Sequence, residues 1–187
     1  FTAFTTILER EGMHPQPAAL CAQLFADASR DGVNSHGINR FPGFVRAIRN
    51  GAVLPNESPA LLAAFNGLER YDGRLGPGPA NAAFAISRAC DLAADHGIAA
   101  VALANTNHWM RAGSYGWMAA TRGCLAILWT NGSPIMPPHG ASVAKLGNNP
   151  MVLAVPRDNG RHVVLDMAMS QYAWGKLKIW ERAGQLA

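Results

Sequence analysis

The chain has 187 residues, of which 49% are hydrophobic and 15% are charged, a composition that predicts one or two globular domains and excludes a disordered or fibrous protein. Its longest apolar runs have the length of a strand, so no membrane-spanning helix is expected. The net charge of +4 comes mostly from arginines scattered along the chain without a basic stripe, which argues against nucleic-acid binding. A modest positive charge suits small anionic substrates, and solvated surface arginines explain it equally well.

Helical patterns dominate the first 60 residues. Thr2–Glu11 and Pro17–Arg30 have apolar residues at steps of three and four, which predicts a helical hairpin. A turn then leads into a third amphipathic stretch, which runs through Ile48 and stops at an Asn-Gly pair. His36 and Arg40 are therefore expected at or near the start of a third helix.

From residue 61 onward short strands and helices alternate, which predicts an α/β region. The expected strands are Leu61–Phe65, Glu69–Tyr71, Ile98–Ala104, Leu125–Trp129, Met151–Pro156 and His162–Asp166. The expected helices are Pro79–His96, Ser114–Arg122 and Trp174–Arg182. The continuous apolar run Ile98–Ala104 is expected to be a buried strand. Residues 131–150, rich in Pro and Gly, are expected to form a long irregular connection, a type of segment that is often functional.

The segment Ser35-His36-Gly37-Ile38-Asn39-Arg40 places an imidazole four positions before a guanidinium, so on a helical turn both project from one face. Histidine can donate a proton to a carbonyl oxygen as hydride arrives. Arginine can hold a carboxylate through two parallel hydrogen bonds. The pair therefore suits a 2-oxo acid. The commoner interpretation of an arbitrary His-x-x-x-Arg pattern is a helix cap beside a surface charge.

His108 is a second polar candidate for the same site. It follows the predicted strand Ile98–Ala104, and ligands of α/β proteins collect at the carboxyl ends of strands. A partly buried histidine whose hydrogen bonds are satisfied by the backbone is an equally good interpretation of this position.

Two further segments invite a cofactor interpretation. The run Gly73-Arg74-Leu75-Gly76-Pro77-Gly78 has the wrong glycine order for a Rossmann fingerprint, and the start of a structural helix is the better interpretation. The strand His162–Asp166 is followed by small residues, so backbone amides there could bind pyrophosphate or ribose. A plain strand-to-helix turn is the alternative for that second segment.

Several other site types lack their motifs. The six histidines form no His-Glu-x-x-His pattern and no zinc-type pairing with cysteine, so no metal site is expected. No Gly-x-Ser-x-Gly elbow and no Walker loop is present, which argues against the commonest hydrolases and NTPases.

The cysteines and the beginning of the sequence bear on the compartment. Cys21, Cys90 and Cys124 are far apart in apolar stretches and are expected to be buried thiols in a reducing environment. No secretory signal pattern opens the sequence, which begins at Phe1. A cytoplasmic protein is therefore expected.

Four segments together resemble the type 2 malate/L-lactate dehydrogenase family: residues 35–42, 107–117, 136–138 and 166–170. They occur in the family's order, and the resemblance runs over essentially the whole chain. It is strongest to the branch that reduces 2,3-diketo-L-gulonate. Members of this family are nearly twice as long as the present chain.

The resemblance implies an α/β protein with an N-terminal helical segment and a mixed-sheet nicotinamide-binding domain of non-Rossmann type. Residues 1–60 would be the helical part of the first domain and carry the catalytic histidine. Residues 61–187 would be the α/β cofactor-binding region, which is expected to be incomplete at its C-terminal end. The resemblance also implies a homodimer and a nicotinamide cofactor, with NAD(H) favoured over NADP(H).

The resemblance also implies roles for particular residues. His36 would be the acid/base residue, with Ser35 and Arg40 beside it as substrate-binding residues. His108 would line the substrate pocket, and the matching histidine is the proton acceptor in ureidoglycolate-oxidising relatives. The residues expected to contact the cofactor are Ser114, His162, Val163, Val164, Leu165, Asp166, Met167 and Ala168.

The expected function is the reversible, NAD(P)H-dependent reduction of a small 2-oxo acid to the 2-hydroxy acid, with 2,3-diketo-L-gulonate as the first choice of substrate. Two alternatives stay open. The same residues could serve a malate, lactate or ureidoglycolate dehydrogenase, or the chain could be a catalytically incomplete ligand-binding fragment.

Overall fold

The structure is a computed structural model that describes residues 1–170 and 174–185. Its α-helices are α1 (Thr2–Arg10), α2 (Pro15–Arg30), α3 (Phe41–Arg49), α4 (Gly78–His96), α5 (Gly113–Thr121) and α6 (Trp174–Arg182). Its strands are β1 (Ala60–Phe65), β2 (Leu68–Asp72), β3 (Ala100–Ala104), β4 (Ala126–Trp129), β5 (Met151–Val155) and β6 (Val163–Met167). A short 3-10 turn, η1 (Asp158–Gly160), joins the last two strands.

The first three helices pack around aromatic side chains. The ring of Phe41 stacks on Phe4 with centroids 4.2 Å apart and meets the edge of Phe25 at 5.1 Å. All three helices were predicted, and α2 begins two residues earlier than expected because Pro15, which lacks an N–H, occupies its first position. Met110, which precedes α5, is buried in the same core. The segment before α5 is thereby held against the helical part of the chain.

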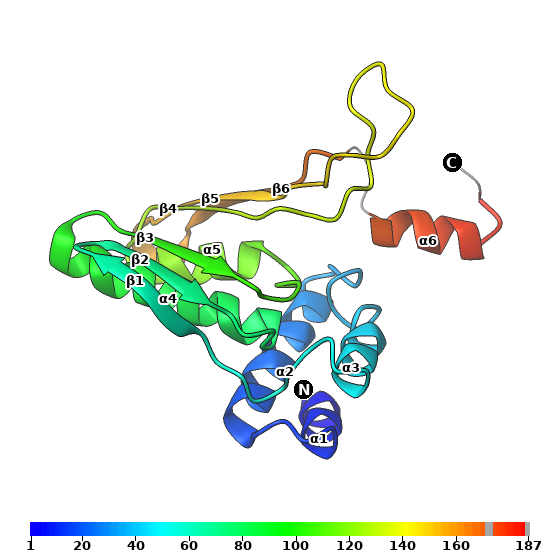
Figure 1. The fold of residues 1–187 in the computed structure, drawn as a ribbon, viewed down its shortest axis with the longest axis horizontal. Coiled ribbons are helices and arrows are strands. Elements are labelled where there is room, and N and C mark those ends of the chain that lie inside the picture. Colours follow the sequence, from blue (N-terminus) through cyan, green and yellow to red (C-terminus); the bar gives the residue numbers. More distant parts are fainter. Residues whose placement is uncertain (171–173, 186–187) are drawn as a thin grey trace.

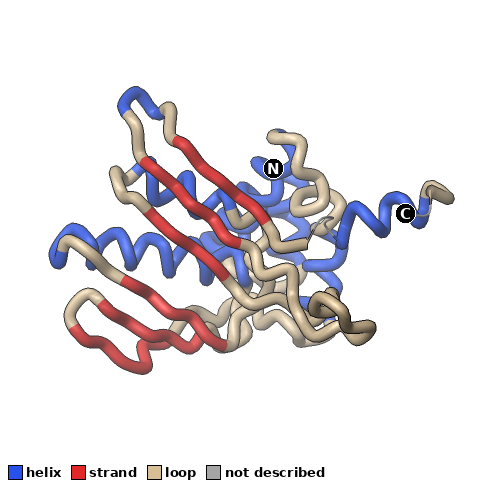
Figure 2. The backbone as a smooth tube through the Cα atoms, turned by 90° about the horizontal axis from the view of Figure 1, so that it is seen from above, coloured by secondary structure: helices blue, strands red, loops and turns tan. Residues whose placement is uncertain are grey.

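Six strands form two small sheets that lie in one layer, with α4 and α5 on one side (Figures 1 and 2). In the first sheet β1 is antiparallel to β2, and β2 is parallel to β3, so this sheet is mixed as expected. In the second sheet β4, β5 and β6 are antiparallel. The α/β class is confirmed.

The prediction that residues 98–104 form a buried strand was wrong. β3 begins only at Ala100, and Ile98 is 82% exposed. Along β3, Val101 and Leu103 are half-buried, whereas Ala100 and its alternate neighbours are exposed. One side of β3 faces α4, and the other side carries only alanines and is covered by no described helix. Both sides are apolar, so the sequence run is continuous although only one side is covered.

The second sheet packs closely on α5. Val152 and Ala154 of β5 are fully buried, and a Cβ atom added to Gly116 of α5 would lie 2.7 Å from Val152 Cγ1. Glycine at this position therefore allows the helix to approach the strand closely. The opposite side of the sheet is exposed, because Ile127, Val163 and other alternate apolar residues face away from α5.

The long connection 131–150 is irregular, as predicted. It contains an isolated bridge between Met136 and Leu146 and projects beyond the sheets in Figure 1. α6 lies apart from the sheets, and its first turn approaches the helical part of the chain, where a Cβ on Gly175 would be 3.3 Å from Ser35 Cβ. Among the described helices, none combines the length and the apolar character needed to cross a membrane.

Candidate active site

His36 and Arg40 lie in a series of tight turns between α2 and α3. They lie near the start of a helix, as predicted, because Arg40 is the N-cap of α3, which begins at Phe41. The expectation that both share one helical turn was not met, since residues 34–40 form turns outside the helix. Phe41 N–H nevertheless donates to Gly37 O at 3.1 Å, which closes a single helix-like turn that contains Arg40. Both side chains therefore come from one short, hydrogen-bonded segment.

Close contact with α2 fixes this segment. Ser29 Oγ donates to Phe25 O at 2.8 Å and accepts a hydrogen bond from Ile38 N–H at 2.8 Å. A Cβ on Gly37 would lie 2.3 Å from Ser29 Oγ and 2.8 Å from Ser29 N, so only glycine fits there. The approach of Gly37 to α2 thus sets the position of His36.

The loop after β3 is positioned by the glycine-rich run 73–78, which begins α4 as the structural interpretation predicted. Asn107 Nδ2 donates to Leu75 O at 2.9 Å. A Cβ on Gly78 would be 2.2 Å from His108 O, so glycine lets α4 approach the loop. Asn81 of α4 is buried, and its Nδ2 donates to Thr106 Oγ1 at 2.9 Å. Several independent contacts therefore fix the backbone that carries His108.

The tautomer of His108 is fixed by its own loop. Met110 N–H donates to His108 Nδ1 at 2.9 Å, so a neutral His108 ring carries its proton on Nε2. Met110 has a φ of +66°, a conformation that non-glycine residues rarely adopt and that is often found at functional sites. His108 can therefore act as a hydrogen-bond donor through Nε2 while it is uncharged.

The structure brings His36 and His108 together. Their rings are stacked, with centroids 5.8 Å apart and planes inclined by 27°. Desolvation, followed by the charges of Arg40 and His36, lowers the pKa of His108 to about 4. Part of the residue is exposed to solvent, but protein atoms surround the ring closely enough to desolvate it. Desolvation and the charge of Arg40 also lower the pKa of His36, while Asp166 acts in the opposite direction. The guanidinium thus acts on both rings.

Two further side chains act on His36, one by a hydrogen bond and one by its charge. Ser35 Oγ lies 3.0 Å from His36 Nδ1, within hydrogen-bonding distance. Asp166, at the carboxyl end of β6, accepts a hydrogen bond from Gly113 N–H at 2.7 Å and is close enough to His36 to raise its pKa. The predicted cofactor strand therefore reaches the predicted acid/base residue.

The predicted cofactor residues on β6 divide between two faces. Val164 and Asp166 face α5. A Cβ atom added to Gly116 of this helix would contact Val164, and one added to Gly113 would contact Asp166. Val163, Leu165 and Met167 form the exposed opposite face, and Ala168 follows the strand. His162 precedes β6, at the end remote from Asp166, and its Nδ1 accepts a hydrogen bond from Arg157 N–H at 3.2 Å.

Ser114 is placed elsewhere. It lines a cavity of about 600 Å³ between α2, α4 and α5, together with Asp31, Arg111 and Trp117. His36, Arg40 and His108 do not line this cavity. A role of Ser114 in cofactor binding stays a prediction that this position does not favour.

Sequence reasoning assigned no role to Arg111. Its guanidinium pairs with Asp31 at 2.5 Å, where α2 ends, and its charge contributes to the lowered pKa of His36. Nor did it assign a role to Asn81, which holds the loop before His108. The available signal was weak: Arg111 lies inside the segment that carries the resemblance, whereas Asn81 sits on an ordinary helical stretch. In the described part of the chain no group of His, Cys, Asp and Glu side chains could hold a metal ion.

Comparison with known protein families places this mixed α/β fold and its pair of stacked imidazoles in one of them. The family model described as malate/L-lactate dehydrogenase matches residues 2–187. The chain belongs to this family.

Individual relatives support the assignment. A 2,3-diketo-L-gulonate reductase of Escherichia coli is 41% identical over 183 residues, which are 98% of this chain and 54% of that protein. A solved structure described as a putative malate/lactate dehydrogenase from E. coli is similar with a TM-score of 0.93 and 29% identity over 98% of this chain and 52% of the other. Sulfolactate dehydrogenase from Methanocaldococcus jannaschii has a TM-score of 0.89 at 31% identity, covering 97% of this chain and 52% of the other. The chain thus spans about half the length of these relatives.

Proposed function

We propose that this chain contributes the substrate-binding and acid/base residues of an NAD(P)H-dependent reductase that converts a small 2-oxo acid to the 2-hydroxy acid. The observation that carries the proposal is the stacked pair of His36 and His108 beside the charge of Arg40. The first choice of substrate is 2,3-diketo-L-gulonate, because the 41% identical relative is named for reducing it.

Each side chain has a role that its surroundings suit. Arg40 is exposed and carries a positive charge that attracts the substrate carboxylate. His108 donates a hydrogen bond to the keto oxygen through Nε2–H, which its Met110 contact leaves protonated. His36 delivers the proton that the oxygen takes up when it becomes a hydroxyl. A reduced nicotinamide, when bound, supplies the hydride that reaches the keto carbon.

Substrate binding also favours the proton on His36. In the free protein, desolvation and Arg40 lower the pKa of His36, so the neutral ring is favoured. A carboxylate that binds Arg40 compensates this positive charge, and the pKa of His36 rises toward its ordinary range. His36 is therefore protonated most readily when the substrate is in place.

The residues at the end of β6 fit a nicotinamide cofactor. Ser170 Oγ is buried and has no hydrogen-bond partner among the described residues, so it can bond to a ribose or pyrophosphate oxygen. The strand end bearing Asp166 and Ala168 is close enough for the Asp166 charge to act on His36, and small residues there allow close approach. These residues would hold the cofactor. NAD(H) is proposed ahead of NADP(H), and a homodimer is proposed on the family resemblance. A cytoplasmic location is proposed on the unpaired, mostly buried cysteines.

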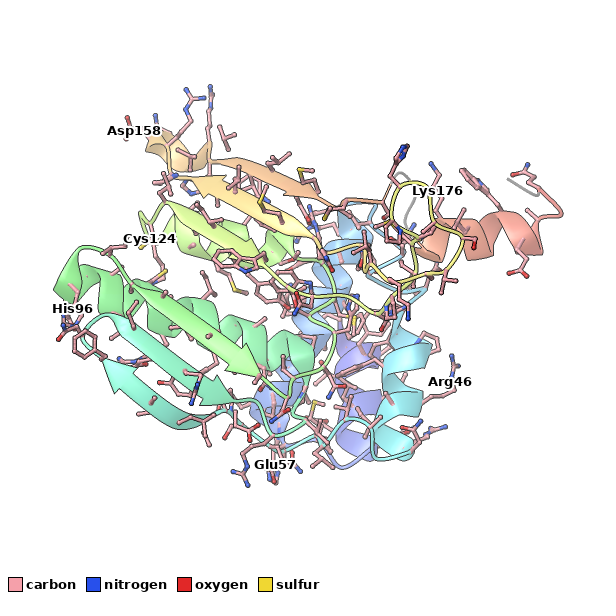
Figure 3. The ribbon with its side chains drawn as sticks, turned by 45° about the horizontal axis from the view of Figure 1, so that its top comes forward. Arg46, Glu57, His96, Cys124, Asp158 and Lys176 are labelled. Carbon is pink, nitrogen blue, oxygen red and sulfur yellow. The ribbon has the colours of Figure 1, made fainter. Side chains whose placement is uncertain are left out.

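The proposal is tested by His36→Gln in the enzyme that contains this chain. Turnover of 2-oxo acids should fall by roughly 10²- to 10⁴-fold, the usual contribution of a positioned acid. NADH and NADPH binding, followed by nicotinamide fluorescence, should be retained. His96→Gln is the matched control, because His96 lies at the far end of α4 (Figure 3). Turnover near wild type in His36→Gln would contradict the assignment.

Two further measurements separate the alternatives. Steady-state rates over a panel of 2-oxo and 2-hydroxy acids distinguish 2,3-diketo-L-gulonate reduction from malate, lactate or ureidoglycolate oxidation. Cofactor binding without turnover of any acid would instead indicate a ligand-binding fragment. Sedimentation velocity at several protein concentrations tests the homodimer.

A further inference from the structure

The turn after α5 carries a cysteine whose position is fixed by the backbone. Gly123 has a φ of +78°, its N–H donates to Ala120 O at 2.9 Å, and Cys124 N–H donates to Ala119 O at 3.0 Å. These two bonds form the Schellman motif that ends many helices. Cys124 is therefore turned back against α4 (Figure 3).

An arginine ties this turn to α4 on both sides of a second cysteine. Arg122 Nη1 donates to Ser87 O at 2.9 Å, and Nη2 pairs with Asp91 Oδ1 at 2.5 Å. Ser87 and Asp91 are four residues apart on α4, and Cys90 lies between them in the sequence. The arginine therefore holds the turn over Cys90.

The two thiols meet as a result. Cys90 and Cys124 belong to one apolar cluster, and their side chains lie within hydrogen-bonding range of each other. Cys124 is half-buried, which corrects the expectation that all three cysteines are buried. Cys90 is 4% exposed but lines the cavity between α2, α4 and α5, which Arg111 and Arg122 also line. Both sulfur atoms are thus within reach of a small anionic reagent.

We infer that Cys90 and Cys124 form a reversible intramolecular disulfide by exchange with a small-molecule disulfide such as oxidised glutathione. The more exposed Cys124 acts first: its thiolate attacks one sulfur of the reagent, and the reagent's sulfur–sulfur bond breaks to release one thiolate. Cys90 then attacks the Cys124 sulfur of the mixed disulfide and releases the second. The two protein protons end on the two released thiols, so the protein loses two electrons and the reagent gains them.

The surroundings support this order of events. Arg122 is close enough to both thiols for its charge to interact with them, and the same charge attracts the carboxylates of an anionic disulfide reagent. Burial raises the pKa of Cys90 to about 11, so this thiol is a poor first nucleophile and reacts when the mixed disulfide is held against it. Cys21 provides an internal reference, because complete burial raises its pKa to about 12 and keeps it unreactive. The inference does not depend on the proposed enzymatic activity.

Oxidation is carried out on the folded protein, and the thiols are counted after unfolding. The reduced chain is incubated with oxidised glutathione, the exchange is quenched with acid, the remaining thiols are alkylated in denaturant, and intact mass and peptide mapping are recorded. Wild type should lose two of its three alkylatable thiols and two hydrogens in mass, with a Cys90–Cys124 cross-linked peptide. Cys21→Ser should lose both of its thiols. Dithiothreitol should restore the thiols in each protein.

Single variants test the direction of exchange. In Cys90→Ser the mixed disulfide should persist on Cys124, and in Cys124→Ser no internal disulfide should form. Arg122→Gln should slow the first exchange several-fold, whereas Arg122→Lys should restore much of the rate. Wild-type protein that keeps three free thiols, or that stops at the mixed disulfide, would overturn the inference. A disulfide through Cys21, or one between two chains, would also overturn the inference. These outcomes are measured on the wild-type protein, so they do not depend on whether a variant folds.

Discussion

The positive charge of Arg40 acts on both imidazoles of the candidate site, and its removal gives a prediction with a definite sign. A cation disfavours the protonated form of a neighbouring imidazole, so Arg40→Gln should raise the pKa values of His36 and His108. For His108 the rise starts from about 4. Titration of the ring carbon–proton signals by NMR measures both values. Arg40→Lys keeps the charge and should leave them nearly unchanged; equal titrations of Arg40→Gln and wild type would contradict the prediction.

Asp166 has the opposite effect on one of these rings. Its negative charge raises the pKa of His36, so Asp166→Asn should lower the pKa further. Asparagine keeps an oxygen that can accept the hydrogen bond from Gly113 N–H, so the strand end should stay in place. In the same NMR titration His108 should change little, because Asp166 is not among the groups that set its pKa. A rise in the pKa of His36 would contradict the assigned proximity.

The contact of Gly37 with α2 predicts a large cost for one methyl group. In Gly37→Ala the new Cβ would meet Ser29 Oγ at 2.3 Å and Ser29 N at 2.8 Å, so the backbone must move. We expect a loss of roughly 1–3 kcal/mol in the free energy of unfolding, measured with urea. Gly43→Ala is the matched control, because its Cβ would meet only Arg46 Nη2, at 3.8 Å. A loss in Gly37→Ala no greater than in Gly43→Ala would show that the close approach is wrong.

A buried carboxylate connects β2 to α4 through three hydrogen bonds from two residues. Glu69 accepts hydrogen bonds from Arg88 Nε at 2.8 Å and from Tyr71 Oη at 2.6 Å, and Arg88 Nη2 lies 2.6 Å from its second oxygen. These bonds, led by the one from Arg88, lower the pKa of Glu69 to about 2. The pKa of Glu69 is lower in the folded protein than in the unfolded chain, so its hydrogen bonds stabilise the fold fully above about pH 4.3. This stabilisation of the fold is lost as the pH falls toward 2.

Glu69→Gln should therefore lower the melting temperature near neutral pH, and its difference from wild type should shrink as the pH falls through that window. Thermal unfolding followed by circular dichroism at a series of pH values measures this difference. Glu57→Gln is the control, since Glu57 pairs with Arg74 at an exposed position and should matter little at any pH. A Glu69→Gln difference that does not change with pH would contradict the pairing.

Element positions were the part of the fold that the sequence predicted best. Periodicity and glycine or proline residues at the boundaries placed most ends within two residues, as for α3 and α4. Burial was harder to predict. An apolar run such as Ile98–Ala104 has the same composition whether a helix covers both sides or one, so local pattern could not show that one face of β3 is exposed.

The two central histidines of the candidate site could be predicted from the sequence, but the contacts that hold them in place could not. The position of His108 after a strand indicated that it would lie near other site residues, and the resemblance paired it with His36. The close approach of Gly37 to Ser29 and the hydrogen bond from Asn81 to Thr106 join segments that are distant in sequence. Such contacts depend on how helices pack, which no local spacing encodes.

One sheet face stands out in the molecule as a whole. The outer face of the β4–β5–β6 sheet is apolar on all three strands, because cross-strand register aligns the side chains that point away from α5. Its exposed members are Ile127, Trp129, Met151, Val155, Val163, Leu165 and Met167. A contiguous apolar surface of this kind is uncommon on a soluble monomer and predicts affinity for hydrophobic dyes.

The double variant Ile127→Thr and Leu165→Thr tests this outer face directly. Both residues pair in register with Leu153, so the two changes place hydroxyl groups on either side of one row of the sheet. Fluorescence of a bound anilinonaphthalene dye should fall, while the free energy of unfolding should change by no more than roughly 0.5 kcal/mol per site, because the side chains are already exposed. Val152→Thr on the buried face should instead destabilise the fold by roughly 1–3 kcal/mol without reducing dye binding. If the double variant bound the dye as strongly as wild type, the outer face could not be the site of dye binding.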